Sequence, residues 1–396
     1  MSTLKVDAIR HNSATTDAIT TSSDGTCTAK LTSVGGAGLS HRNIVINGAM
    51  KVSQRGDFFG NVGQQQYTID RFITLHSYGN VINVTQTSTS PDGFSKAYKV
   101  DCQVADTSIG AAEFMFIRHK IEAQDLQQLA YGTSGAKSIT LSFYVRSTVT
   151  GTYAICLQQK DNGSKQVNGT YTINSANTWE RKIFTFAGDT SGVINDDNGH
   201  GLDILWTLVA GSDRTSGSAR PTWTAHANAD ESFGHTANVL SSTSNDWLIT
   251  GVQLEVGDTA TSFEHRSYGD ELARCQRYFA IFPGRSGGIP FWQGYMGSSN
   301  GYCSIPVPNF NFRAVPSPTD ATTGTSTSTG NIYDVYGNNI NSRFAGNGTV
   351  TLSCGGYAPS GIGLIMDFGA HQSGTKEGVV ASWNGAVPGI YLDAEL

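Results

Sequence analysis

Three short segments of the chain carry residue types that can do chemistry. The first, Gly297-Ser298-Ser299-Asn300-Gly301, has the G-x-S-x-G form of a hydrolase nucleophile loop. That motif needs a strand before the serine and a helix after it, so that the serine oxygen is exposed. The next stretch here, Tyr302 to Pro306, has the pattern of a strand. With 46 glycines in the chain the match is expected by chance, and we predict no catalytic residue.

The second segment is acidic and precedes a strand-like stretch. Asp196, Asp197, Asn198 and Asp203 offer the carboxylate and amide oxygens that a hard cation such as Ca²⁺ prefers. The segment lacks the spacing and the final glutamate of an EF-hand loop, so a polar turn before a buried strand is the alternative interpretation. The histidines form no H-x-x-x-H or Cys/His cluster. The sequence predicts no cofactor and leaves calcium at these four residues as the candidate metal.

The third segment is aromatic. Phe291, Trp292, Tyr295 and Tyr302 lie in or beside the glycine-flanked stretch from 288 to 297. Exposed rings stack against the apolar faces of sugars, while neighbouring polar side chains bond to the sugar hydroxyls. These four residues are the predicted glycan-binding residues, and packing into a core is the alternative.

Composition excludes several classes of protein. The 396 residues include 26 Lys and Arg against 32 Asp and Glu, so no basic excess is present to neutralise nucleic-acid phosphates. No apolar run approaches the roughly 20 residues of a membrane helix, so we expect no membrane insertion. The six cysteines are far apart, which is unlike a disulfide framework. The start of the chain has no signal-peptide pattern, and we expect the protein to stay in the cytoplasm of the cell that makes it.

Alternating apolar and polar residues predict the elements that hold these segments. Ile139, Leu141, Phe143 and Val145 alternate with polar residues, and stretches near 153–157, 171–173, 202–208 and 248–256 repeat the pattern. Turn sequences such as Asp161-Asn162-Gly163 separate them. We predict an all-β chain with a central antiparallel β-sandwich over 41–265. A short helical piece over 123–131, stopped by Gly132, interrupts it.

The two ends differ from the centre. Residues 1–57 contain no Phe, Tyr, Trp or Pro, and residues such as Leu4, Val6 and Ile9 are isolated apolar side chains in a polar segment. Such a segment cannot close a core alone, so residues 1–40 are predicted to stay flexible or to order on a partner. Residues 284–396 become Gly-rich and β-like again, and we interpret them as a second, C-terminal β-sandwich-like domain.

A helix is predicted between these parts, over 266–283. Ser267 with Asp270 is a plausible capping pair, and Pro283-Gly284 ends the stretch. Apolar residues fall between them at spacings of four, three, four and three, at Tyr268, Leu272, Cys275, Phe279 and Phe282. That is an a/d seam about two heptads long. The helix either packs on a sheet of the same chain or forms a helical neck at an oligomer axis.

Several motifs together resemble a domain of bacteriophage tail fibres, of the type found in cyanophages and other marine phages. The pattern N-x-x-I-N-G-x-M…Q-R…Y-x-x-D-R-W is close to residues 43–50, 54–55 and 67–72, with Phe72 in place of tryptophan. Residues 139–145, 177–180, 249–257 and 260–279 are also similar. Residues 2–7 look like the leader of such fibres, and residues 305–316 resemble a tip-domain pattern with an altered gap.

This resemblance implies a homotrimeric virion tail fibre with a carbohydrate-binding jelly-roll domain. Its N-terminal segment, with Leu4, Val6 and Ile9, would attach to other tail proteins, and residues 284–396 would form the distal tip. The implied partner is a host surface polysaccharide or lipopolysaccharide. Two other functions stay open: a capsid decoration or head-fibre protein, and a glycan-degrading tail enzyme.

Overall fold

The structure is a computed structural model that describes residues 41–283 without a gap, with shorter segments on either side. Those segments are residues 8–9, 19–21, 23, 27–29, 292–296, 301–307, 312–314, 317–320, 327–334, 349–357, 361–367, 378–383 and 389–395. The fold is all-β, as the alternating pattern predicts. Within the described residues, no helix is both long and apolar enough to span a membrane.

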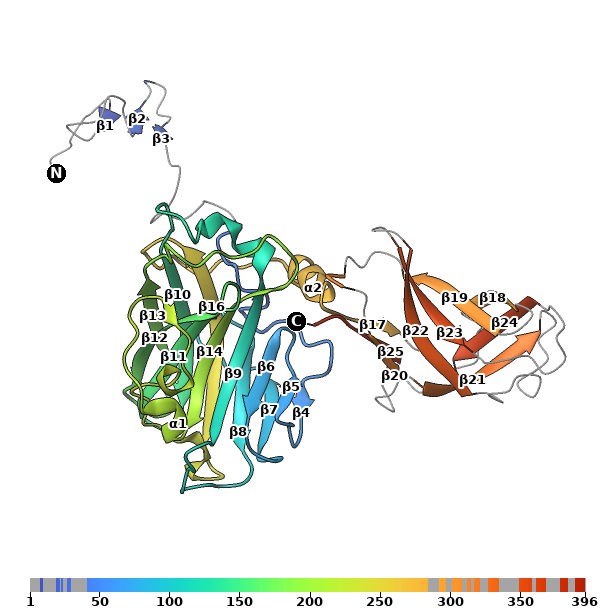
Figure 1. Ribbon diagram of the computed structural model, residues 1–396, viewed down its shortest axis with the longest axis horizontal. Helices are drawn as coiled ribbons and strands as arrows, with labels where there is room; N and C mark the ends of the chain where they lie inside the picture. The colour runs from blue at the N-terminus through green and yellow to red at the C-terminus, as the bar shows by residue number, and fades with distance from the viewer. Residues whose placement is uncertain are drawn as a thin grey trace.

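The central part is a jelly-roll-like sandwich of two antiparallel sheets (Figure 1). The six-stranded sheet contains, in spatial order, β13 (Glu180–Phe186), β10 (Ile139–Ser147), β16 (Asp246–Val256), β8 (Ala97–Cys102), β7 (Ile82–Thr87) and β4 (Phe58–Phe59). The seven-stranded sheet contains β15 (Thr224–Ala225), β12 (Lys165–Ile173), β11 (Gly151–Gln159), β14 (His200–Ala210), β9 (Phe114–Glu122), β6 (Phe72–His76) and β5 (Gln65–Tyr67).

Alternation along the strands fills the space between these sheets. On β10, Leu141, Phe143 and Val145 are fully buried in the main core cluster, and Trp206 on β14 and Trp247 on β16 join them. Apolar side chains that leave water in this way provide most of the favourable free energy of folding. The hairpin between β11 and β12 turns at Asn162 and Gly163, whose φ angles of 49° and 86° suit this residue pair.

The sandwich also has short helical elements. They are η1 (Ala123–Leu129), α1 (Ser212–Thr215), η2 (Asn228–Asp230), η3 (Val239–Ser241) and α2 (Tyr268–Gln276). The helical piece predicted near 123–131 is a 3₁₀ helix, and it ends at Ala130, which has a left-handed φ of 52°, rather than at Gly132. Leu126 and Leu129 of this element are buried in the main core.

Two asparagines of the N-x-x-I-N-G segment connect distant parts of the sandwich. The Asn43 side chain donates to the carbonyl of Val252 at 3.0 Å and accepts from the amide of Leu254 at 3.1 Å. The Asn47 side chain donates to the carbonyls of Val52 and Asp70 at 2.8 and 2.9 Å, and it accepts from the amide of Val52 at 3.0 Å. Asn43 and Asn47, two residues of the N-x-x-I-N-G segment, therefore connect distant parts of the sandwich through buried hydrogen bonds.

The prediction of one helix over 266–283 is wrong in its second half. Helix α2 ends at Gln276, and β17 (Phe279–Pro283) comes next as a strand. β17 pairs with β25 (Gly389–Asp393), more than 100 residues further along the chain. Local helical spacing cannot reveal such a distant partner, and pairing with it overrides the pattern. Pro283 is tolerated because β17 is the edge strand of its sheet.

The predicted cap of this helix is confirmed. The Ser267 hydroxyl accepts from the amide of Asp270 at 3.2 Å and donates to its carboxylate at 2.7 Å. We expect Ser267→Ala to lower the free energy of unfolding by about 1 kcal/mol, because an amide at the helix start loses its acceptor. Urea unfolding followed by fluorescence measures the change. Ser267→Thr keeps the hydroxyl and serves as the control, and an equal loss in both variants would contradict the capping role.

The C-terminal part is a closed six-stranded barrel (orange and red in Figure 1). Its strands, in order around the barrel, are β18 (Trp292–Met296), β19 (Gly301–Val307), β23 (Gly361–Asp367), β22 (Thr349–Tyr357), β21 (Thr327–Asp334) and β24 (Gly378–Trp383). β25 leaves the barrel and lies between β17 and β20 (Ser317–Asp320). At the other end of the chain, β1 (Ala8–Ile9), β2 (Ile19–Thr21) and β3 (Cys27–Ala29) form a sheet of their own.

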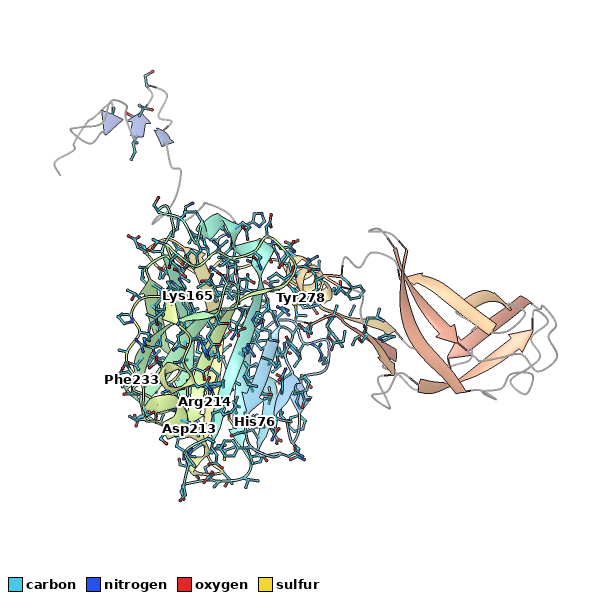
Figure 2. All side chains as sticks on the ribbon, viewed as in Figure 1. His76, Lys165, Asp213, Arg214, Phe233 and Tyr278 are labelled. Atoms are coloured by element: carbon cyan, nitrogen blue, oxygen red, sulfur yellow. The ribbon has the colours of Figure 1, made fainter. Side chains whose placement is uncertain are left out.

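The end of the chain returns to the sandwich and is clamped there. The amide of Ala394 donates to the carbonyl of Tyr278 at 2.7 Å. The carboxylate of Glu395 forms ion pairs with Arg71 and Arg55. Tyr278 lies on the side of the sandwich nearest the barrel (Figure 2). We call the side chains of Arg55, Arg71, Tyr278 and Glu395 the C-terminal clamp.

Candidate functional site

Four rings gather on the outer side of the six-stranded sheet. Phe94 comes from the loop between β7 and β8, Tyr144 from β10, and Phe263 and His265 from the segment after β16. The Phe94 ring centre lies 5.4 Å from that of Tyr144, 5.0 Å from Phe263 and 5.3 Å from His265. His265 is exposed and the other three rings are half-buried. We call this set the aromatic cluster.

A glycine in β16 makes room for the cluster. Gly251 has a φ of 61°, and a Cβ at this position would lie 2.7 Å from the Phe94 ring and 2.9 Å from the Tyr144 ring. No side chain fits at that distance without moving the rings. Tyr144 points outward because its neighbours Phe143 and Val145 are both in the main core and strand side chains alternate. The lack of a side chain at Gly251 and the position of Tyr144 on its strand therefore determine where the Phe94 and Tyr144 rings lie.

A pocket of about 630 Å³ adjoins the cluster at His265. Most of its lining side chains are charged or polar, and they come from the start of the sandwich, the segment before α2, α2 itself and the residue after it: His41, Glu264, His265, Arg266, Ser267, Asp270, Ala273, Arg274 and Arg277. The volume is in the range of sites that hold small ligands. The polar groups of the pocket thus lie next to the rings of the aromatic cluster.

Most of the charged side chains that line the pocket already form hydrogen bonds with other groups of the protein. Arg277 donates from two nitrogens to the carboxylate of Glu122 at 2.8 Å, and Arg266 donates to the carbonyl of Val45 at 3.1 Å. Arg274 makes one longer contact, 3.4 Å to Nδ1 of His41. The pKa of His265 is lowered, by burial first and then by the charge of Lys51. At neutral pH His265 is therefore an uncharged ring with one donor and one acceptor nitrogen.

The rings and the pocket groups together offer contacts that suit a sugar ring. A pyranose ring has an apolar face that can cover Phe94 and Tyr144, and hydroxyls that can bond to the pocket groups. Rings and polar groups fixed by the backbone need little ordering on binding.

The predicted glycan-binding residues lie in the barrel region. Phe291 falls outside the described residues, as do the side chains of Trp292, Tyr295 and Tyr302. The backbone places Tyr295 of β18 directly opposite Tyr302 of β19, so these two residues share one face of the barrel. Trp292 pairs with Ala381 of β24. Their role as ligand contacts stays a prediction.

The predicted metal ligands are not brought together. Asp203 lies on β14 and is fully buried in ion pairs with Arg118 and Lys160. The Asp197 carboxylate accepts from the backbone amide of Gly199 at 2.8 Å, and the side-chain amide of Asn198 donates to the carbonyl of Arg313. Asp196 is exposed. Among the described residues, no group of three or more His, Cys, Asp or Glu side chains is placed to hold a metal ion.

The predicted neck residues have mixed environments. Cys275 packs with Ile46, Val52 and Tyr278 inside the chain, with Leu272 against them. Phe279 is buried too, under the guanidinium of Arg55, whereas Tyr268 is 57% exposed. The side chain of Phe282 is outside the described residues. The side chains of Cys275 and Phe279 are therefore covered by their own chain rather than facing outward.

The predicted attachment residues lie near the start of the chain. Leu4 and Val6 are outside the described residues. Ile9 is in β1, where its backbone pairs with that of Ile19 in β2. Within the described residues, β1, β2 and β3 pair only with one another.

Comparison with known proteins gives weak likenesses. No protein-family profile and no curated protein matches the sequence. One similar structure is the enzymatically active domain of tailspike protein 4 from bacteriophage CBA120: 12% identity, TM-score 0.30, 57% of this chain and 23% of that chain. A family 30 carbohydrate-binding module has 9% identity and a TM-score of 0.28, over 58% and 94% of the two chains. TmCBM61, solved with β-1,4-galactotriose, has 9% identity and a TM-score of 0.26, over 54% and 99%. Likenesses with TM-scores this low carry no argument about function.

Proposed function

We propose that this chain is a non-enzymatic virion fibre protein whose central sandwich binds host surface glycans at the aromatic cluster. The observation that carries the proposal is the cluster of partly exposed rings beside a pocket of about 630 Å³ whose lining side chains are mostly charged or polar. Saccharide sites need this pair of features, because stacking supplies affinity and hydrogen bonds select the sugar.

The place in the virion rests on the resemblance to tail fibres. In this proposal residues 1–40 attach to other tail proteins, and three copies assemble into one fibre. Each fibre then carries three weak sugar sites, and their effective concentration raises the avidity without new contacts. A capsid decoration protein is the second candidate, because attachment to the shell would need the same N-terminal segment.

Two carboxylates, Asp203 on β14 and Glu231 next to β11, support a non-enzymatic role for the outer side of the seven-stranded sheet. Glycoside cleavage needs one protonated and one ionised carboxyl group. Burial raises the pKa of Asp203, but the hydrogen bond from His200 and the charge of Arg118 outweigh it and bring the pKa to about 2. For Glu231, burial is likewise outweighed by His226 and Arg214, and its pKa is lowered. Both groups are ionised at neutral pH, so this pair has no general acid.

A glycan array with the purified full chain tests the binding. The ligand found there is then titrated into the wild type and into Tyr144→Ala. We expect Tyr144→Ala to weaken binding about ten- to a hundredfold, because burial of an aromatic ring contributes about 1.5–3 kcal/mol. Phe58→Ala is the matched control, since Phe58 is a 60% exposed ring on the same sheet but outside the cluster. Thermal unfolding of each variant confirms that the fold is retained.

Three outcomes would contradict the proposal. Equal weakening by Phe58→Ala would place the binding site away from the cluster. Release of reducing sugar from host envelope by the purified chain would favour the enzyme. Antibody labelling of intact particles on the shell, rather than on the tail, would favour the decoration protein.

A further inference from the structure

Arg181 lies directly beside the aromatic cluster. It is on β13, the edge strand next to β10 (Figure 1), and its backbone pairs with that of Tyr144. Residues directly opposite each other in an antiparallel pair point to the same side of the sheet, with Cβ atoms about 5 Å apart. The Arg181 side chain is therefore on the outer side of the six-stranded sheet, next to the Tyr144 ring.

The guanidinium of Arg181 has a neutral partner. Arg181 is exposed, and its Nη2 donates to the backbone carbonyl of Thr261 at 2.7 Å. Among the described residues, no Asp or Glu carboxylate forms an ion pair with it. The bond to the carbonyl uses one of the five N–H donors of an arginine and does not cancel its charge. Both the charge and the remaining donors are therefore available to a ligand.

The bond to Thr261 also joins Arg181 to a third segment of the cluster. Phe263 follows Thr261 by two residues. The Thr261 hydroxyl donates to the carboxylate of Glu255 at 2.6 Å, and Glu255 is 0% exposed, so a ligand in solvent does not meet this carboxylate. The guanidinium is thus held between the Tyr144 strand and the Phe263 segment.

Other charged side chains near the rings have partners of opposite charge. Arg146 is two residues beyond Tyr144 on β10, and its guanidinium lies 3.8 Å from the carboxylate of Asp246. Glu264 lies 3.6 Å from Arg266. Each of these charges is largely cancelled by its neighbour. Arg181 differs from them because its partner is a carbonyl.

A second positive charge acts at the His265 ring. Burial lowers the pKa of His265, and the charge of Lys51 lowers it further. Lys51 is half-buried, and within the described part of the chain it forms no ion pair with a carboxylate. Positive charge is therefore present beside two of the four rings, which favours an anionic ligand over a neutral one.

We propose that the aromatic cluster selects an acidic glycan, and that Arg181 binds the carboxylate of a uronic acid whose ring stacks on Tyr144. In a uronic acid the carboxylate is attached directly to the sugar ring, so a ring on Tyr144 brings it to the neighbouring guanidinium. Arginine is well suited to this role, because its planar fork matches the two oxygens of a carboxylate. The inference rests on the proposed function and names the class of sugar that the same site prefers.

The test is a calorimetric titration of the full chain at low salt. The probes are galacturonate and mannuronate trisaccharides and the neutral methyl ester of each. We expect the wild type to bind an acidic probe more tightly than its ester. Arg181→Gln should weaken binding of that acidic probe about tenfold and leave the ester unchanged. Arg181→Lys keeps the charge and should lose less, and added salt should weaken binding of the acidic probe alone.

Arg146→Gln is the matched control, because it removes an arginine from the same side of the sheet that already has a carboxylate neighbour. It should leave the affinity for every probe unchanged. A loss equal to that of Arg181→Gln would overturn the inference, since general attraction by charge would then explain the binding. Equal weakening of acid and ester by Arg181→Gln would also overturn it, because Arg181 would then only support the shape of the cluster.

The failure of this inference is distinguishable from the failure of the proposed function. If neutral glycans from the array bind and Tyr144→Ala weakens them, while no uronate probe binds more tightly than its ester, the inference fails and the proposed function stands. If Tyr144→Ala leaves the binding of every glycan unchanged, or no glycan binds, the proposed function fails and this inference fails with it.

Discussion

Arg71→Met is expected to lower the free energy of unfolding by about 3–5 kcal/mol, because it leaves the carboxylate of Glu395 buried without its main partner. Arg71 is 1% exposed, its guanidinium lies 3.4 Å from the Tyr278 ring centre, and it donates to the carbonyl of Lys120 at 2.6 Å. Burial is the largest influence on the pKa of Arg71 and lowers it, but the Glu395 carboxylate, together with Tyr278 and Tyr67, makes the net shift upward. Equilibrium unfolding in urea gives the change.

A matched control shows whether the loss of stability comes from burial of the ion pair or from removal of a charge alone. Lys99→Met removes one partner of the Lys99–Asp101 pair, which is 2.6 Å long but 28% exposed on both sides. Exposed pairs contribute about 0–1 kcal/mol, so a small change is expected. Adding Glu395→Leu to Arg71→Met should recover part of the loss, since the unpaired charge is then gone. Equal losses in Arg71→Met and Lys99→Met would contradict the clamp.

Asn47→Ala is expected to lower the free energy of unfolding by a similar amount, about 3–5 kcal/mol. Its side chain makes three buried hydrogen bonds to the backbone of Val52 and Asp70, and alanine would leave each partner unsatisfied. Asn47 also has a φ of 60°, a left-handed conformation that alanine adopts less readily than asparagine.

The control for this variant is Asn83→Ala. The Asn83 side chain accepts one exposed hydrogen bond, from the amide of Asn61 at 2.9 Å. Water can replace that bond, so the loss should stay below about 1 kcal/mol. Urea unfolding of both variants makes the comparison. A loss in Asn47→Ala no greater than in Asn83→Ala would refute its role as a connector.

The strands of the sandwich can be predicted from the sequence because alternation is local. Ile139 to Val145 is a strand as predicted, and the Ser267 cap is confirmed, because both depend on neighbours within a few residues. The pairing of β17 with β25 cannot be predicted in this way, since the partner strand lies more than 100 residues away. For the same reason the apolar spacing places Phe279 in a helix seam, although it lies in a strand beneath Arg55.

The candidate site cannot be predicted from the sequence, for a related reason. Phe94, Tyr144 and Phe263 come from three segments separated by 50 residues or more, and no spacing in the sequence links them. Gly251 is the one local signal, because a glycine inside an apolar strand marks a close approach by other groups. The aromatics of residues 291–302 are the more visible candidates in the sequence, because they lie close together in the chain.

The measurement that tests the central claim most directly is hydrogen–deuterium exchange of the full chain, with and without the tightest glycan from the array. Binding at the aromatic cluster predicts protection near Phe94, in β10 around Tyr144 and in residues 258–267. The barrel strands β18 and β19, which carry Trp292, Tyr295 and Tyr302, should exchange unchanged. Protection confined to β18 and β19, with none near Phe94 or Tyr144, would contradict the proposed site.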